Sequence, residues 1–143
     1  MTLNEKDRDL LALLSENART PVALLARKLG LSRTTVQAKI ERLERDGVIS
    51  GYGVRLSDDF ERGLVRAHIL ITLAAKSLGG VTRDLHAISH VRSVFSVSGS
   101  FDLIAIVAAS SISELDKIID QIGDIEGVDR TLSSIILSTR IDR

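Results

Sequence analysis

The chain has 143 residues, of which 44% are hydrophobic and 27% charged, so it can bury a core in one or two domains. It contains no cysteine, which excludes disulfide scaffolds, cysteine-ligated metal sites and cysteine nucleophiles. No apolar run is as long as a membrane span, and the charged N-terminus lacks the apolar core of a signal peptide. We therefore expect a cytoplasmic protein with no membrane partner.

The formal net charge of zero conceals an uneven distribution. Residues 1–56 hold ten basic and seven acidic residues, a net charge of +3, whereas residues 57–143 have a net charge of −3. The segment 19–45 alone holds seven basic and two acidic residues. This pattern indicates a nucleic-acid-binding module joined to a second module. The alternative is a solvated helix face on which basic residues cluster by chance.

The apolar spacing is helical as far as residue 46 and predicts three helices. Asn4 is placed to cap the first helix, and Asp7 to complete a capping box. Thr20-Pro21 indicates an N-cap followed by proline at the first position of the second helix. Ser32 is the predicted N-cap of the third.

The second and third helices have the spacing of a helix-turn-helix. Ala26 is small where the two helices cross, and Gly30 suits the tight turn between them. The free side of the third helix then presents side chains that match base edges and phosphates in the major groove. The predicted DNA-contacting residues are Ser32, Arg33, Thr34, Thr35, Gln37, Ala38, Lys39 and Arg42. Of these, Arg33, Thr34, Gln37 and Ala38 suit base edges, and Lys39 and Arg42 suit phosphates. The alternative is a three-helix module that packs against protein.

The hydrophobic period changes to that of strands after Val48. Residues 51–63 predict an extended strand and a polar linker. Beyond it the pattern predicts strands at 65–73, 91–98, 102–109 and 128–139, and helices at 78–88 and 111–123. The order βαββαβ is the ferredoxin-like arrangement, so the predicted fold class is α+β. We expect a DNA-binding domain over residues 1–50 and a ferredoxin-like domain over residues 64–143.

Several short motifs occur along the chain in a fixed order. The first half contains Asn17-Ala18-Arg19, Gly30-Leu31-Ser32 and the more specific run Gly47-Val48-Ile49-Ser50-Gly51-Tyr52. The second half contains Val97-Ser98-Gly99-Ser100-Phe101-Asp102-Leu103 and Glu126-Gly127-Val128. Over residues 3–141 the chain resembles the Lrp/AsnC family of leucine-responsive, or feast/famine, transcription regulators.

The resemblance implies a winged-helix-like DNA-binding domain followed by a ligand-sensing domain whose sheets pair into dimers. Such dimers assemble further, often into octamers, and two recognition helices of a dimer match a pseudo-palindromic site on double-stranded DNA. An amino acid effector binds between dimers and shifts oligomeric state or DNA affinity. The effector-binding residues implied are Gly99, Ser100, Phe101 and Asp102, with Thr131 and Ser133 as second-rank candidates. No metal or further cofactor is implied.

The chemistry of the Gly99–Asp102 turn is compatible with an amino acid ligand. Asp102 offers an acceptor for an ammonium group, and the backbone N–H groups of a glycine-rich turn, with the Ser100 hydroxyl, offer donors for a carboxylate. An ordinary hairpin turn, with Asp102 capping its own backbone, is the alternative.

Two further classes of protein compete with an effector-gated regulator. His86 and His90 are four residues apart, but a helix end between them would separate them, so no metal site is predicted. An enzyme on the same scaffold, such as a haem-precursor decarboxylase, needs histidines around a tetrapyrrole, and the chain has three. An architectural DNA-compacting protein would need no effector. We predict a sequence-specific transcription regulator gated by a small effector, and not an enzyme.

Overall fold

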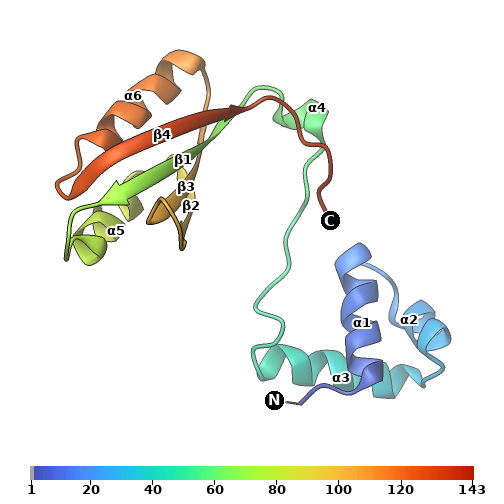
Figure 1. The fold of residues 1–143 in the computed structure, drawn as a ribbon. Helices are drawn as coiled ribbons and strands as arrows, with labels where there is room; N and C mark the ends of the chain where they lie inside the picture. Colours follow the sequence, from blue (N-terminus) through green and yellow to red (C-terminus); the bar gives the residue numbers. More distant parts are fainter. Residues whose placement is uncertain (1) are drawn as a thin grey trace. The chain divides into compact units, whose positions relative to one another are not determined.

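The computed structural model describes residues 2–143, which form two compact units, one ending at Arg55 and the other running from Leu56 to Asp142 (Figure 1). The first unit contains three helices, α1 (Glu5–Glu16), α2 (Val22–Leu29) and α3 (Arg33–Arg45). Each matches a helix predicted from the sequence.

The caps of α1 and α3 are those predicted, and the start of α2 is not. The Asn4 side chain accepts a hydrogen bond from the Asp7 backbone N–H at 2.8 Å, and the Asp7 carboxylate accepts one from the Asn4 N–H at 3.1 Å. The prediction of Thr20 as the N-cap of α2 is wrong, because its hydroxyl donates to the Asn17 carbonyl at 2.7 Å. Pro21 is the N-cap residue instead, without a side-chain cap.

The first unit has a small aliphatic core that sets the angle between α2 and α3. Gly30 follows α2 with φ 68°, a left-handed conformation that side chains with a Cβ rarely adopt, so it allows the tight turn. The buried residues of this core are Leu10, Leu14, Leu25, Ala26, Leu29, Val36 and Leu43.

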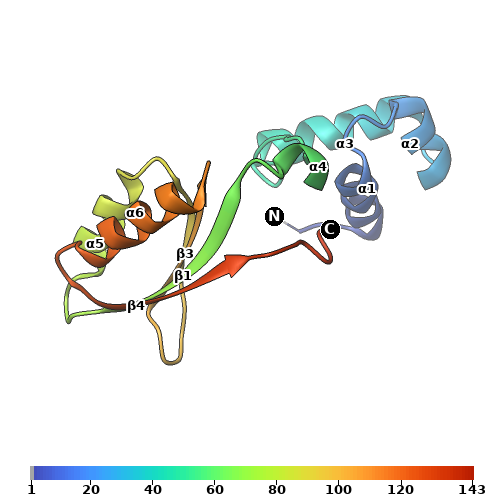
Figure 2. The ribbon, with the colours of Figure 1, turned by 90° about the horizontal axis from the view of Figure 1, so that it is seen from above.

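The second unit is a four-stranded antiparallel sheet with two helices on one side. Its elements are β1 (Val65–Leu73), α5 (Leu78–His86), β2 (Val91–Ser96), β3 (Leu103–Ala109), α6 (Ile112–Gly123) and β4 (Val128–Ile136). The strand order is β2-β3-β1-β4. Figure 2 shows α5 and α6 on the same face of the sheet. The predicted α+β class with a βαββαβ unit is confirmed.

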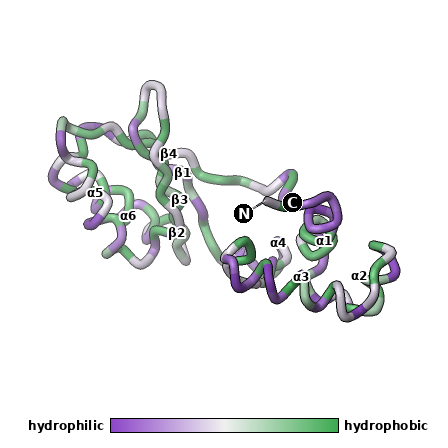
Figure 3. Tube along the Cα trace, turned by 90° about the horizontal axis from the view of Figure 1, so that it is seen from below, coloured by the Kyte–Doolittle hydropathy of each residue, from purple (hydrophilic) through white to green (hydrophobic). Residues whose placement is uncertain are grey.

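The two faces of this sheet differ in what covers them. Ile69 and Ile71 of β1 face the helices and are fully buried, together with Leu85 of α5 and Ile122 of α6. The other face has no helix, yet many of its side chains are also apolar. Cross-strand pairing places on this free face Leu70, Phe95, Ile104, Ile106 and Leu132, together with the polar His68 and Ser134. β3 contains only apolar residues, as expected for a strand that is apolar on both faces, and Figure 3 colours the whole chain by hydropathy.

Three strand ends and one helix end differ from the prediction. The chain turns at residues 97–102, where the Val97 N–H donates to the Asp102 carbonyl at 3.0 Å, so β2 ends earlier and β3 starts one residue later. β4 ends at Ile136 because its last pairing partner is Arg66, near the start of β1. α5 ends at His86 because Ile88 closes a tighter turn on Leu85.

Residues 51–57 have no regular secondary structure, and a single helical turn, α4 (Asp58–Glu61), follows them. Ser57 caps this turn by accepting from the Phe60 N–H at 3.2 Å. In the described part of the chain, no helix has both the length and the apolar character needed to span a membrane.

Candidate functional site

The start of α3 presents two hydroxyls that bond to each other. Ser32 accepts a hydrogen bond from the Thr35 backbone N–H at 3.1 Å, and its Oγ lies 2.8 Å from Thr35 Oγ1. Both residues are exposed. Their first role is therefore to fix the N-terminus of α3, whose free N–H groups and dipole favour an anion such as a phosphate.

Four predicted base-contacting residues line one shallow groove of about 390 Å³ on the first unit. The lining residues are Val22, Arg33, Thr34, Gln37, Ala38 and Glu41. Glu41 was not among the predicted contacts, although it lies one helical turn beyond Gln37. The Gln37 amide nitrogen donates to Glu41 Oε1 at 3.2 Å, which leaves the Gln37 amide oxygen free as an acceptor.

The two basic residues predicted to contact phosphates from the middle of α3 both bind a carboxylate of α1. Lys39 Nζ and Arg42 Nη2 each lie 2.7 Å from Asp7 Oδ1. The Lys39 side chain is 13% exposed and that of Arg42 is 39% exposed. The hydrogen bond from Lys39, more than the backbone N–H of Asn4, lowers the pKa of Asp7 despite its burial. Asp7 is therefore ionised at neutral pH.

In the second unit, the Gly99–Asp102 turn is tied to the end of β1. Gly99 has φ 110°, which favours glycine at that position. Asp102 Oδ2 accepts a hydrogen bond from the Leu73 N–H at 2.8 Å, and the Asp102 N–H donates to the Ile71 carbonyl at 2.9 Å. One carboxylate oxygen of Asp102 thus serves the fold, while Oδ1 is left for another donor.

A cavity of about 290 Å³ lies beside this turn. It is formed by the β1–α5 loop and the end of β2, with the lining residues Leu73, Ala74, Ala75, Lys76, Ser77, Leu78, Ser96, Val97 and Asp102. On the same end of the sheet, the Arg130 guanidinium lies 5.6 Å from the centroid of the Phe101 ring, within cation–π range. Lys76 and Arg130 bring positive charge near the turn, and sequence reasoning missed both because they are single basic residues outside any motif.

Thr131 and Ser133 do not line this cavity. They pair with Ile71 and Ile69 of β1, so their side chains lie on the face of the sheet that carries the helices. They share a face, as their spacing predicted, and the structure brings neither of them to the wall formed by Asp102.

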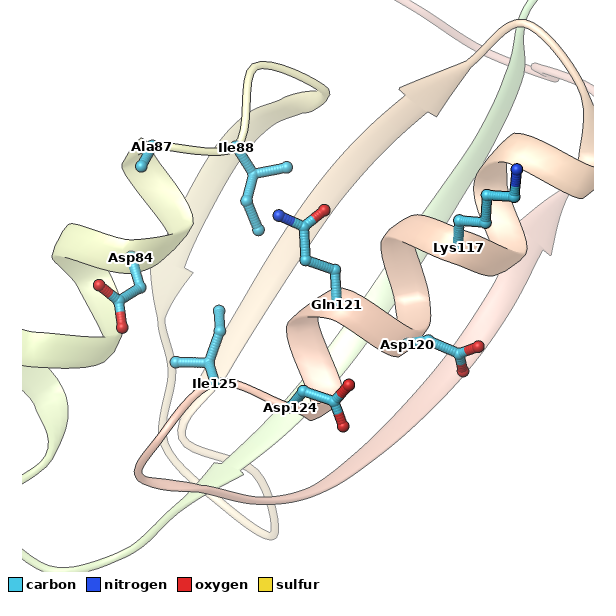
Figure 4. A pocket seen from close by; sticks show the side chains of 8 residues that line it. All are labelled: Asp84, Ala87, Ile88, Lys117, Asp120, Gln121, Asp124 and Ile125. Atoms are coloured by element: carbon cyan, nitrogen blue, oxygen red, sulfur yellow. The ribbon is translucent and has the colours of Figure 1, made fainter.

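A wider groove of about 590 Å³ runs between α5 and α6 (Figure 4). Ile88 and Ile125 point into it from the two sides, and its rim carries three carboxylates, those of Asp84, Asp120 and Asp124. With the Lys117 ammonium also lining the groove, its rim carries a net negative charge, unlike the largely apolar free face of the sheet.

The two histidines with metal-ligand spacing are separated. His86 is the last residue of α5, and His90 lies beyond it, where Nε2 contacts Glu114 Oε1. The carboxylate of Glu114 also accepts hydrogen bonds from the Ser110 hydroxyl and N–H, while the Glu114 N–H donates to the Ser111 hydroxyl at the start of α6. Within residues 2–143, no group of three His, Cys, Asp or Glu side chains is placed to hold a metal ion.

Comparison with known proteins matches each unit to a domain family. Residues 3–50 match the winged helix-turn-helix DNA-binding family, and residues 66–143 match the Lrp/AsnC ligand binding domain. The chain belongs to the Lrp/AsnC family. Its relatives include the HTH-type transcriptional regulator LrpA of Pyrococcus horikoshii, 32% identical, with 94% of this chain and 96% of the relative covered.

Solved structures of Lrp/AsnC proteins share the fold over nearly the whole chain. Escherichia coli AsnC superposes with a TM-score of 0.88 at 28% identity, covering 100% of this chain and 97% of AsnC. A feast or famine regulatory protein from Mycobacterium tuberculosis, solved as a complex with L-methionine, has a TM-score of 0.87 at 32% identity, covering 99% and 96%. This Lrp/AsnC protein is therefore a DNA-binding transcription regulator with a ligand-binding domain, and it is not an enzyme.

Proposed function

We propose that this regulator binds pseudo-palindromic promoter DNA as a homo-oligomer and that a free amino acid controls its assembly or its DNA affinity. The observation that carries the proposal is the exposed groove at the start of α3 in a chain that also has a ligand-binding domain. A regulator of this kind acts where the genome lies, which favours the cytoplasm. The amino acid class of effector is supported by the L-methionine complex of the M. tuberculosis relative.

Arg33, Thr34, Gln37 and Ala38 are the proposed base contacts. They lie together on an exposed groove, as a recognition helix in the major groove requires. Glu41 takes one of the two amide N–H donors of Gln37, so the amide oxygen and the second N–H remain for a base edge such as that of adenine. Ser32 and Thr35 are the proposed phosphate contacts at the helix start, and the partly exposed guanidinium of Arg42 is a third.

The DNA-binding assignment is tested by Arg33→Ala on DNA selected from a random pool by the wild-type protein. We expect a loss of about 1–3 kcal/mol on the selected site and relaxed preference at one base position. Arg92, an exposed residue of β2 in the second unit, provides a matched control, since Arg92→Ala should leave the selected sequence unchanged. An equal loss on selected and random DNA would contradict base contact by Arg33.

The free face of the sheet is the proposed dimer interface. Phe95 and Leu132 on this face are 53% and 54% exposed, which is unusual for large apolar side chains that share one surface. A two-fold interface places a surface against its own copy. If the α5–α6 groove formed the interface, its acidic rim would face the carboxylates of the second copy and repel them. The apolar sheet face, in contrast, is complementary to itself. Further assembly to an octamer is proposed by analogy with the family.

The proposed effector site is the Gly99–Asp102 turn with the adjoining cavity, and Thr131 and Ser133 as more distant members. Oδ1 of Asp102 is the acceptor for the ammonium group, since Oδ2 is bound by Leu73. Backbone N–H groups of the turn, with the Ser100 hydroxyl, are the donors for the carboxylate. Arg130 adds a cation on the same end of the sheet.

Thermal melts against the twenty amino acids test the effector site. A ligand at about 100 times its dissociation constant adds about 2.7 kcal/mol if it binds only the folded protein. Asp102→Asn keeps an acceptor for the Leu73 N–H and removes the charge, so it should abolish the shift while DNA binding remains. A full ligand response in that variant would contradict the role of Asp102. The absence of a shift with any amino acid would favour an effector-free architectural protein.

A further inference from the structure

Asp7 is the one buried charged residue among residues 2–143, and every oxygen of its carboxylate is used. Oδ1 accepts hydrogen bonds from Lys39 Nζ and Arg42 Nη2, both at 2.7 Å, and Oδ2 accepts the Asn4 backbone N–H at 3.1 Å. The side chain of Asp7 is 2% exposed. The carboxylate of α1 therefore binds two of the cations of the recognition helix.

These bonds change which cations α3 can offer to DNA. Helix α3 carries four basic residues, Arg33, Lys39, Arg42 and Arg45. The Lys39 ammonium is mostly buried against Asp7, so a phosphate contact would require the loss of a charge-assisted hydrogen bond. Arg42 is more accessible to DNA than Lys39, because its side chain is 39% exposed.

We propose that Asp7 is a specificity-determining residue, which holds Lys39, and Arg42 in part, away from the phosphate backbone. The proposal rests on the proposed insertion of α3 into DNA. Phosphate contacts strengthen binding to every sequence alike, because each releases counterions, whereas base contacts strengthen binding only to the correct site. Asp7 removes a cation from the phosphate contacts and leaves the base contacts of Arg33 and Gln37 in place. It therefore lowers the affinity for non-specific DNA more than the affinity for the correct site.

The ion pair between Arg42 and Asp7 leaves a buried polar atom unpaired, which an apolar contact between the two helices would not do. Arg42 Nε is buried without a hydrogen-bond partner, because the guanidinium reaches Asp7 through Nη2 alone. An apolar contact between α1 and α3 would hold the helices without leaving a buried donor unpaired. The chain keeps the polar cluster instead, which fits a role in setting the charge of the DNA-binding surface.

The decisive measurement is the salt dependence of binding to a short duplex of random sequence, made with the full-length protein. In Asp7→Asn the amide oxygen still accepts from the Asn4 N–H, and the ion pairs are lost. We expect the slope of log K against log salt to steepen by about 0.9 for each cation released, and affinity to rise about eightfold for each at 0.1 M salt. The ratio of affinity for selected DNA over random DNA should fall. If Asp7 served the fold alone, the slope would be unchanged and both affinities would fall with the folded fraction.

Lys39→Met gives an independent answer that does not need Asp7→Asn to fold. If Asp7 holds Lys39 away from DNA, Lys39→Met alone leaves the wild-type slope unchanged. Where Asp7→Asn folds, adding Lys39→Met should also remove the part of the steepening that is due to Lys39. Arg45→Met removes one positive charge from an exposed position of the same helix that does not bond to Asp7, and it is the matched control for the change in charge. A slope reduced by about 0.9 in Lys39→Met alone would overturn the proposal and leave DNA binding by α3 intact. If the wild-type protein bound no DNA in this assay, the proposed function itself would be overturned.

Discussion

Different interactions stabilise the interior of each of the two units of this regulator. The C-terminal unit has thirteen buried apolar residues between one sheet and two helices, and its core is wholly aliphatic. The N-terminal unit has seven, and it adds the buried Asp7 cluster that joins α1 to α3. The three-helix core buries fewer side chains than the C-terminal core, so a single polar cluster contributes a larger share of the stability of this unit. The ligand-binding unit is thus stabilised mainly by buried apolar area, whereas the DNA-binding unit depends also on the ion pairs of Asp7.

The largest effect is expected from Ile69→Ala, at the centre of the sheet and fully buried. Removal of this side chain leaves a cavity that the strands and helices around it cannot fill, so we expect the free energy of unfolding to fall by about 4 kcal/mol. Urea denaturation measures the loss. Leu137→Ala, at a position that is 93% exposed, is the control and should change stability by less than about 0.5 kcal/mol. A loss near 1 kcal/mol for Ile69→Ala would mean that area does not dominate this unit.

Hydrophobic periodicity was enough to predict the layers of the fold. β1 and β3 are both inner strands of the sheet, but polar residues alternate with apolar ones over much of 65–73, whereas 103–109 is apolar on both faces. Both patterns can be read from the local sequence. Element ends were less predictable, because β4 ends where β1 has no residue left to pair. The start of α2 was missed because the Thr20 hydroxyl binds the preceding turn.

Gly127→Ala tests the C-terminal unit at a glycine that lies close to the Ser77 side chain. Gly127 has φ 99°, and an added Cβ would lie 2.6 Å from the Ser77 Cβ at the start of α5. Backbone strain and overpacking together should lower stability by about 3 kcal/mol. Gly99→Ala is the matched control, since Gly99 has a similar φ of 110° but open space around it. Equal losses in thermal melts of the two variants would show that strain acts alone and that the Ser77 contact contributes nothing.

The polar contacts that shape the two candidate sites could not be predicted from the local sequence pattern. Asp7 was predicted only as a capping residue, and its bonds to Lys39 and Arg42 span 32 and 35 residues of sequence. The link between Asp102 and Leu73 likewise spans 29 residues. Such pairs depend on how elements pack, which the spacing of apolar residues within one element does not encode. The exposed side chains of α3 were predictable because a helix-turn-helix fixes its free face through its own short core.

The smallest effect expected, and the one that separates the two units most directly, is their response to acid. The pKa of Asp7 is lowered, chiefly by the hydrogen bond from Lys39, so the cluster stabilises the fold fully above the usual pKa of 3.8 and loses this stabilisation as pH falls through the lowered pKa. Glu114 in the other unit also has a lowered pKa, chiefly through the Ser110 hydroxyl, but it is solvent-screened. Urea midpoints measured from pH 6 to pH 3 should therefore fall less steeply in Asp7→Asn than in the wild type, while Glu114→Gln follows the wild type. Parallel acid limbs for Asp7→Asn and the wild type would mean that the charge on Asp7 does not stabilise the DNA-binding unit, and that its seven apolar residues suffice.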